Sequence, residues 1–362
     1  MKALIIEKEK LLHNINVIKG MTNSTIIAVL KGNGYGLGIL EYAKLLKENS
    51  IDFFALSELN DAVMLRENGF DSKLLLISST SLEDEADKLV ANDIMPTVGS
   101  INSAIAINTA AKKLDTVVKI HLKIDTGFGR FGFAWDKPEE IVSLLKDLEN
   151  ITIDGTYTHL SFAFEKKPKS SIEQFNKFNK CIEGLKAAGI NPGILHIASS
   201  SAFLRFPQMH LDAVRVGSAF LGRIPVQNNV GLKKIAYMKS NIIEMKELPE
   251  KHFIGYANTY KTKRKTTIGI IPVGYMDGFG VEKSRDTYRF MDVLRYMYND
   301  LKSLNKRYYI RLNSDQRVPI LGRISMFNIV VDLTGTNAKI GDEVYLDVNP
   351  ILVESTIERQ FK

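Results

Sequence analysis

The sequence predicts an α/β fold in which an N-terminal (β/α)8 barrel, a TIM barrel, is followed by a mostly β C-terminal domain. Two observations predict the barrel: eight short apolar runs within roughly the first 220 residues, and helical patterns between most neighbouring runs. The third observation is a change after about Ile235, where strand-like runs follow one another without intervening helices. We therefore expect residues 1–230 to form the barrel and residues 231–362 the β domain.

The eight apolar runs predict the barrel strands in chain order. They are 26–30, 53–56, 74–77, 94–98, 117–124, 151–157, 194–197 and 213–216. Helical patterns connect most of them, for example at 37–48, 58–68, 82–92, 138–150 and 172–188. In such a barrel the active site is formed at the carboxyl ends of the strands, so the residues that follow each run are the candidates for function.

The C-terminal part contains further strand-like runs. They are 237–248, 266–273, 307–312, 318–321, 328–333 and 343–346. One segment differs, because Phe290, Val293, Leu294, Met297 and Leu301 recur at helical spacing and predict an amphipathic helix between about 286 and 304.

Composition excludes several classes of protein. The net charge is +7, yet the basic residues are scattered singly among acidic ones and form no stripe with interleaved aromatic residues, so we expect no nucleic-acid partner. The single cysteine, Cys181, cannot form an internal disulfide, which favours a reducing, cytoplasmic location. No apolar run approaches a membrane span, and the one at residues 1–6 is too short for a signal peptide.

The first predicted strand delivers a lysine, Lys31, into a loop that contains four glycines and Tyr35. Glycines allow the backbone to approach a ligand closely. A lysine that is desolvated at such a place has a lowered pKa and can form a Schiff base with an aldehyde. A lone lysine at a strand end is more often simply solvated, so this interpretation depends on the rest of the chain.

Three other strand ends carry polar side chains. After the fifth run, Asp125 and Arg130 share a glycine-interrupted loop, where the guanidinium suits a carboxylate or phenolate ligand or else pairs with Asp125 to hold the loop. His159 closes the sixth run and is either structural or directed to the same cavity. Three serines, 199–201, follow the seventh run and form either a phosphate nest or a helix cap.

The eighth run contains Arg215, followed by Gly217 and Ser218. An arginine inside an apolar run needs a partner or a ligand. A phosphate beside the loops after strands seven and eight is also the usual arrangement in barrels of this type.

Seven motifs in series resemble the alanine racemase family over nearly the whole chain. They include Lys31-Gly-Asn-Gly-Tyr35, Lys123-Ile-Asp-Thr-Gly-Phe-Gly-Arg130, Arg205-Phe-Pro, Val214-Arg215-Val-Gly217, Gly255-Tyr256-Ala-Asn-Thr-Tyr260, Ile271-Pro-Val-Gly-Tyr275-Met-Asp-Gly and Gly322-Arg-Ile-Ser-Met326. The resemblance implies a pyridoxal 5'-phosphate (PLP) barrel followed by a β domain, assembled as a head-to-tail homodimer with shared active sites.

The resemblance also implies roles in holding the cofactor. Lys31 would form the internal aldimine, and Tyr35 would contact the phosphate together with Ser200, Gly217 and Ser218. Arg215 would face the pyridine nitrogen, and His159 would lie against the ring and bond to Arg215.

Further roles concern the substrate. Tyr256, supplied in trans by the C-terminal domain of the other subunit, would be the second catalytic base, because racemisation needs bases on opposite faces of the α-carbon. Arg130 and the Met326 amide would bind the substrate carboxylate, and Tyr275 would crowd the side-chain pocket. Lys123 matches a lysine that is carbamylated in some members. No metal site is expected.

The chain departs from the family pattern at a few positions. Phe327 replaces an aspartate near the entrance, Ser199 replaces an asparagine, and Glu358 stands where a phosphate-contacting tyrosine is usual. The segment 280–306 is longer than in the family; it gates the entrance, extends the dimer contact, or is a surface decoration. Residues 160–165 are more apolar than usual.

The sequence therefore predicts a PLP-dependent racemase that interconverts L- and D-alanine. Alternatives are a racemase of serine or another small amino acid, and a non-catalytic PLP-binding module. A barrel-type decarboxylase is disfavoured, because Cys181 lies in the wrong segment and Arg215 occupies the position of the acidic partner such enzymes use.

Overall fold

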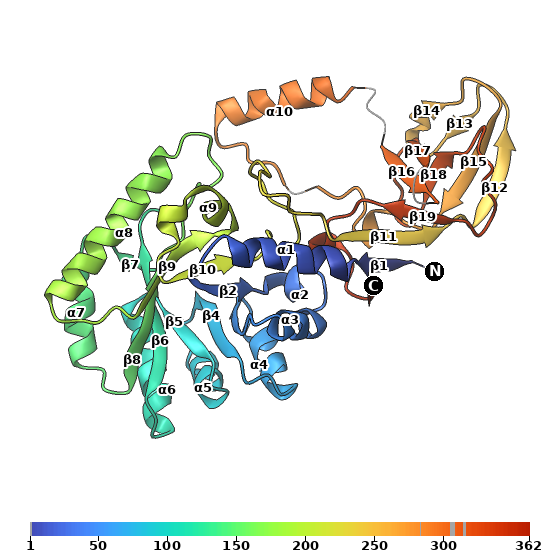
Figure 1. The fold of residues 1–362 in the computed structure, drawn as a ribbon. Coiled ribbons are helices and arrows are strands. Elements are labelled where there is room, and N and C mark those ends of the chain that lie inside the picture. The colour runs from blue at the N-terminus through green and yellow to red at the C-terminus, as the bar shows by residue number, and fades with distance from the viewer. Residues whose placement is uncertain (1, 283, 305–307, 314–315) are drawn as a thin grey trace. The chain divides into compact units, whose positions relative to one another are not determined.

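Eight parallel strands form a closed barrel, which confirms the predicted fold class. The computed structural model describes residues 2–282, 284–304, 308–313 and 316–362 (Figure 1). Pairing of β5 with β6 closes the sheet, and β7 (Phe133–Ala134) adds a short strand beside β6. The barrel strands are β2 (Thr25–Val29), β3 (Phe53–Leu56), β4 (Lys73–Ser79), β5 (Met95–Val98), β6 (Val118–Asp125), β8 (Ile151–Tyr157), β9 (Ile194–Ser199) and β10 (Ala213–Val216).

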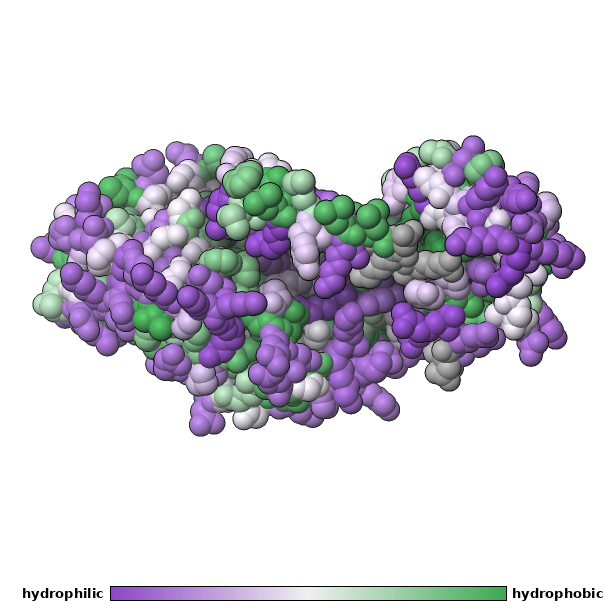
Figure 2. Space-filling view, turned by 90° about the horizontal axis from the view of Figure 1, so that it is seen from above, coloured by the Kyte–Doolittle hydropathy of each residue, from purple (hydrophilic) through white to green (hydrophobic). Residues whose placement is uncertain are grey.

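Helices connect the strands and cover the outside of the barrel (Figure 1). They are α1 (Lys8–Gly20), α2 (Lys31–Tyr35), α3 (Ile39–Glu48), α4 (Leu59–Glu67), α5 (Glu83–Ala91), α6 (Ile101–Lys113), α7 (Pro138–Lys146), α8 (Lys169–Ala187) and α9 (Ser200–Arg205). Among the described residues, no helix is long and apolar enough to cross a membrane. Hydrophilic side chains are spread over much of the face seen in Figure 2, in line with the scattered charges of the sequence.

Alternate side chains of each strand point into the barrel, where they pack against those of the neighbouring strands and form an apolar cluster. The cluster consists of Ile27, Val29, Phe53, Ala55, Leu75, Met95 and Ala213. Tyr35, from the loop after β2, packs against this cluster. The barrel interior is therefore filled by packed side chains, which support the residues at the carboxyl ends of the strands.

The second compact unit contains a nine-stranded β-sheet and, among its described residues, one α-helix, and it consists of the chain up to Lys8 together with Ala236–Lys362. Its sheet order is β12-β15-β18-β17-β16-β19-β11-β1-β20. These strands are β1 (Ala3–Ile6), β11 (Ala236–Asn241), β12 (Glu244–Leu248), β15 (Thr266–Ile271), β16 (Tyr309–Leu312), β17 (Gln316–Leu321), β18 (Ile329–Asp332), β19 (Glu343–Leu346) and β20 (Glu358–Phe361), with β13 (Phe253–Ile254) and β14 (Tyr260–Lys261) as a separate pair.

The N-terminal strand differs from the expected organisation, in which residues 1–230 belong together. All four residues of β1 are buried, and β1 pairs antiparallel with β11 and parallel with β20. The backbone groups of a buried strand must be hydrogen-bonded, so β1 needs a strand at each of its two edges, and the end of the chain supplies one. Glu358 consequently lies in β20, in register with Ala3.

The expected strand 237–248 is two strands, β11 and β12, which pair with β19 and β15 respectively. The first residues of the expected strand 307–312 fall partly outside the described residues, and β16 begins at Tyr309. The predicted amphipathic helix is present as α10 (Phe290–Lys302). Its apolar side chains, among them Phe290, Met291 and Leu301, are exposed.

Candidate active site

A cavity of about 380 Å³ opens at the carboxyl ends of the barrel strands. The structure brings together around it eight of the residues that the sequence predicted. These are Lys31, Tyr35, Arg130, His159, Ser200, Arg215, Gly217 and Ser218. They come from the ends of five strands and the loops that follow them, so only closure of the barrel could assemble them.

Lys31 begins a left-handed turn. Gly32, Asn33, Gly34 and Tyr35 all have φ between 53° and 64°. L-residues other than glycine and asparagine rarely adopt this conformation, at a cost of roughly 1–2 kcal/mol per residue. The Asn33 side chain also accepts a hydrogen bond from the Ile39 amide at 3.0 Å, at the start of α3. This turn is why the motif needs glycine and asparagine between Lys31 and Tyr35.

The turn directs the Tyr35 ring at Gly217. A Cβ atom added at Gly217 would lie 2.4 Å from the Tyr35 hydroxyl oxygen, so only glycine leaves room for this contact. Burial raises the pKa of Tyr35 to about 12, which keeps the hydroxyl protonated at neutral pH. Tyr35 therefore offers a hydrogen-bond donor to an anion in the cavity.

Ser200 is buried and lies opposite two backbone amides. The Gly217 N–H donates to Ser200 Oγ at 3.0 Å, and the Ala219 N–H donates to it at 3.3 Å. A hydroxyl has two acceptor lone pairs and one O–H. Because both lone pairs are engaged, the O–H of Ser200 is left to donate to a ligand in the cavity.

Arg215 lies in β10 and is 4% exposed. Its two terminal nitrogens donate to the carbonyl oxygens of Thr158, His196 and Ile197 and to the imidazoles of His196 and His159. In the described part of the chain, no carboxylate pairs with Arg215 and no protein acceptor is recorded for its Nε–H. Burial lowers the pKa of Arg215 to about 10, so the guanidinium is still charged at neutral pH.

Two further ionisable side chains of the cavity, His159 and Lys123, are shifted toward their neutral forms. Burial, followed by the charge of Arg215, lowers the pKa of His159 to about 3. Burial lowers the pKa of Lys123 to about 7, and Arg215 and Arg130 act in the same direction. His159 Nδ1 accepts from Arg215 at 3.3 Å, so the neutral ring carries its proton on Nε2.

Arg130 sits at the rim of the cavity on the loop after β6. Its guanidinium lies 4.6 Å from the centre of the Phe128 ring. The Asp125 carboxylate accepts hydrogen bonds from the amides of Gly127, Phe128 and Gly129, which shapes the loop. The loop is thus held through its backbone, and Arg130 is exposed at its end.

Tyr256, Tyr275 and Met326 belong to the β unit, and all three side chains are exposed. Tyr256 is 71% exposed and opens a turn in which Gly255, Ala257 and Asn258 have φ of 76°, 56° and 51°. Left-handed backbone at non-glycine residues costs free energy and is concentrated at functional sites. The turn therefore presents the phenol to solvent at the expense of local strain.

The loops that carry Tyr275 and Met326 touch each other. The Tyr275 amide donates to the Ser325 carbonyl at 3.1 Å, and the Met276 amide donates to the Met326 carbonyl at 3.2 Å. A Cβ atom at Gly274 would lie 2.2 Å from the Met326 oxygen, so the glycine permits this approach. Gly255 lies next to Arg323, which belongs to the same motif as Met326. The three motifs of the β unit therefore meet on one side of that unit.

Sequence reasoning missed Tyr157, the last residue of β8. Its ring lies 4.9 Å from the Arg215 guanidinium carbon and 5.0 Å from Lys123 Nζ, and it lines the cavity. An aromatic residue directly before Thr158-His159 at a strand end was the available signal. Its orientation depends on the inward alternation of β8, which a short run does not fix.

Comparison with known proteins gives the same assignment for both units. Residues 6–225 match the family model of the alanine racemase N-terminal domain, and residues 235–358 match that of the C-terminal domain. An alanine racemase of Methanococcus maripaludis is 33% identical over 340 residues, 92% of this chain and 85% of the relative. An alanine racemase of Clostridium novyi is 32% identical over 349 residues, 94% of this chain and 84% of the relative.

Comparison with solved structures leads to the same family. The alanine racemase of Clostridium difficile 630 superposes with a TM-score of 0.84 at 28% identity, covering 98% of this chain and 94% of that one. A barrel with a lysine after its first strand, followed by a β domain, defines the class of PLP-dependent barrel enzymes. Within that class, the chain belongs to the alanine racemase family. The chain is accordingly an isomerase, and its cofactor is PLP.

Proposed function

We propose that this chain interconverts L- and D-alanine with PLP by a two-base mechanism, as a homodimer in which Tyr256 of one copy completes the barrel site of the other. The observation that carries the proposal is the convergence of Lys31, Ser200 and Arg215 on one cavity of a chain that belongs to the alanine racemase family. The exposed, strained turn at Tyr256 supports the second half of the site.

The cavity fits PLP in three respects. The Ser200 O–H and the Tyr35 hydroxyl supply donors for a phosphate, next to the Gly217 position that has no room for a side chain. The Arg215 Nε–H is available to a ring nitrogen, which is an acceptor when it is unprotonated. The Lys31 amine would hold the cofactor covalently. When bound, PLP supplies the electron sink that makes the α-proton of an amino acid acidic.

Arg215 selects the state of the ring nitrogen. Because its pKa of about 10 lies far above that of a pyridine, the arginine keeps its own proton and donates it as a hydrogen bond. With PLP bound, Arg215 would thus leave the ring nitrogen unprotonated and weaken the electron sink. A weaker sink favours the return of a proton over the side reactions of a long-lived carbanion.

The two bases are Lys31 and the partner's Tyr256. Removal of a proton from one face and its return on the other require groups on opposite sides of the α-carbon. In each direction one of the two groups is unprotonated and accepts the α-proton from its face, and the other is protonated and donates a proton to the opposite face. A phenolate is stabilised by positive charge, and the cavity supplies Arg130 and Arg215.

Arg130 and the Met326 amide would bind the substrate carboxylate, with Arg130 as a charged donor at the rim. Tyr275 and Tyr256 are bulky and exposed on the β unit, so a small side chain is favoured. Phe327 is also exposed beside Met326, where the family pattern has an aspartate, so serine and other small amino acids are alternative substrates.

Solvent-deuterium exchange tests the proposal. In wild type, deuterium is expected at the α-carbon of the inverted product from both L- and D-alanine. In Tyr256→Phe, racemisation should fall roughly 10²–10⁴-fold, the usual contribution of one general base, while exchange without inversion persists for one enantiomer. Tyr288→Phe, a change at another exposed tyrosine, is the matched control.

Two results would contradict the proposal. If the wild-type holoenzyme exchanges no deuterium into the α-carbon, the chain is a PLP-binding module without turnover. Equal racemisation in wild type and Tyr256→Phe would exclude the phenol as a base. A panel of alanine, serine and other small amino acids with the wild-type enzyme identifies the preferred substrate.

A further inference from the structure

Two buried histidines lie between Arg215, at the carboxyl ends of the barrel strands, and Asp154, in a cavity at their amino ends. Arg215 Nη1 lies 2.7 Å from His196 Nδ1, and His196 Nε2 lies 2.8 Å from His121 Nδ1. His121 Nε2 lies 3.8 Å from a carboxylate oxygen of Asp154. Both histidines are 0% exposed. Hydrogen bonds join Arg215, His196 and His121 in a row inside the barrel, Asp154 lies just beyond hydrogen-bonding distance at its end, and of the four only Arg215 borders the active-site cavity.

The chemistry of arginine fixes the direction of every hydrogen bond in this row. A guanidinium only donates, so His196 Nδ1 must accept. Neutral His196 then carries its proton on Nε2 and donates it to His121 Nδ1, and neutral His121 carries its proton on Nε2, directed at Asp154. Burial lowers the pKa of both histidines, in agreement with neutral rings; the charge of Arg215 acts in the same direction, and Asp154 partly opposes the shift at His121.

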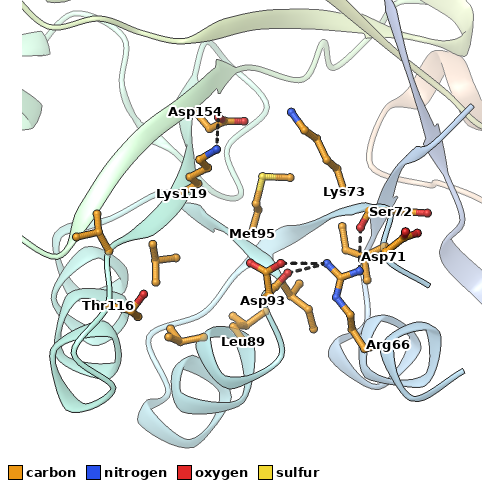
Figure 3. A pocket seen from close by; sticks show the side chains of 15 residues that line it. Arg66, Asp71, Ser72, Lys73, Leu89, Asp93, Met95, Thr116, Lys119 and Asp154 are labelled. Carbon is orange, nitrogen blue, oxygen red and sulfur yellow. Dashed lines mark hydrogen bonds and ion pairs between the residues drawn. The ribbon is translucent and has the colours of Figure 1, made fainter. Parts of the chain in front are cut away.

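The row ends in a second cavity at the amino ends of the strands. Asp154 lines this cavity with Lys73 and Lys119, and Lys119 Nζ lies 4.0 Å from the Asp154 carboxylate (Figure 3). The Asp154 side chain is 22% exposed. The nearby His121, together with the charge of Lys73, lowers the pKa of Asp154 and keeps it ionised. A negative charge thus faces the final N–H of the row.

The barrel is adapted to hold these rings. A Cβ atom at Gly155, in the middle of β8, would lie 2.6 Å from the His121 ring, so glycine makes the space although it weakens a strand. The register of β6 against β8 also shifts between Ile120 and His121. Tyr157 stacks on His196 at 4.7 Å. Two apolar residues would fill this interior without buried polar groups, so packing alone does not account for the pair.

We infer that His121, facing Asp154, is a positioning residue for the racemase reaction: it accepts the His196 proton and so holds His196 Nδ1 as the acceptor that orients Arg215. The inference rests on the proposed function, because it assumes that Arg215 faces the ring nitrogen of PLP. His121 touches neither cofactor nor substrate and acts only through His196.

Two variants at position 121 separate this role from simple packing. His121→Asn can keep an acceptor near the position of Nδ1, whereas His121→Leu removes it. We expect kcat of the Leu variant to fall about ten- to a hundredfold, as for other residues that orient a ligating side chain, with the KM for alanine unchanged. The Asn variant should keep near wild-type kcat. Lys119→Gln, at the exposed end of the row, is the control.

The tautomers give a readout that does not depend on activity. In the ¹⁵N-labelled apoprotein at neutral pH, long-range ¹H–¹⁵N spectra should show His121 and His196 both protonated on Nε2 only. Protonation of either ring on Nδ1 would overturn the inference, and so would wild-type kcat in the Leu variant. If that variant does not fold, the wild-type spectra decide. Absence of PLP binding or racemisation in the wild type would instead refute the proposed function.

Discussion

At the scale of residues, the cavity is a concentration of positive charge. Lys31, Arg130 and Arg215 line it beside Lys123, whose pKa is lowered to about 7, and none of its described lining residues is acidic. Because buried charges need partners, such a site favours ligands that bring anions. A phosphate and a carboxylate would supply them, which is why the apoprotein should be stabilised by PLP and by anions generally.

Ser200→Ala tests the donor that the geometry leaves for the phosphate. A hydrogen bond to a charged group contributes about 1.5–3 kcal/mol, so the dissociation constant of PLP should rise roughly ten- to a hundredfold. Equilibrium dialysis of the apoprotein with PLP measures it. Ser161→Ala, an exposed serine that does not line the cavity, should leave the affinity unchanged. Equal affinity in both variants would mean that Ser200 does not bind the phosphate.

At the scale of elements, the left-handed turn after β2 positions both Lys31 and Tyr35. Its backbone is acceptable because Gly32, Asn33 and Gly34 occupy it. At Gly34 a Cβ atom would also lie 3.2 Å from the Tyr42 ring. Strain and crowding therefore act together at this one position.

Gly34→Ala is expected to lower the free energy of unfolding by about 1–2 kcal/mol, the cost of placing a side chain in left-handed backbone. PLP affinity should fall as well, because the turn also carries Tyr35. Urea denaturation measures the first effect. Gly20→Ala is the matched control, since Gly20 ends α1 and a Cβ atom there meets nothing within 4 Å. A Gly34 variant as stable as that control would show that the turn is not strained.

The strands were predictable because each barrel strand is a short apolar run with turn residues around it. The runs at 53–56, 151–157 and 213–216 coincide with β3, β8 and β10. What the sequence could not show is which strands become neighbours. The strand Ala3–Ile6 looks like any apolar run, and its partners β11 and β20 lie more than 200 residues away.

The same limit applies to the site. Motifs identified Lys31, Arg215 and Ser200, because each follows or lies in an apolar run. The contact between His121 and His196 joins residues 75 positions apart and arises only when the barrel brings β6, β8 and β9 together. Sequence spacing carries no trace of such a pairing.

At the scale of the whole molecule, the buried histidines make stability depend on pH. The pKa values of His121 and His196 are lowered in the folded state, so below about 6.5 the unfolded chain binds protons that the folded chain does not. Stability should therefore fall as the pH decreases, by about 1.4 kcal/mol per pH unit for each histidine. Urea titrations of the apoprotein between pH 7 and 5 measure the slope. His252→Gln, at an exposed histidine, should leave it unchanged.

The assembly itself can be tested by mixing two inactive variants. Lys31→Ala and Tyr256→Phe should each lose nearly all racemisation when purified alone. If Tyr256 acts in trans, a hybrid dimer has one site with both changes and one site with neither, because each site takes Lys31 from one copy and Tyr256 from the other.

Random association makes half of the dimers hybrids with one intact site of two, so co-refolded or co-expressed variants should regain about a quarter of wild-type activity. If Tyr256 instead served its own copy, every site of the hybrid would carry one change and the mixture would stay inactive. Differently tagged copies, purified through both tags, show that hybrids have formed. An inactive preparation of verified hybrids would therefore exclude a shared active site, whereas recovery of activity can come only from a phenol that crosses between copies.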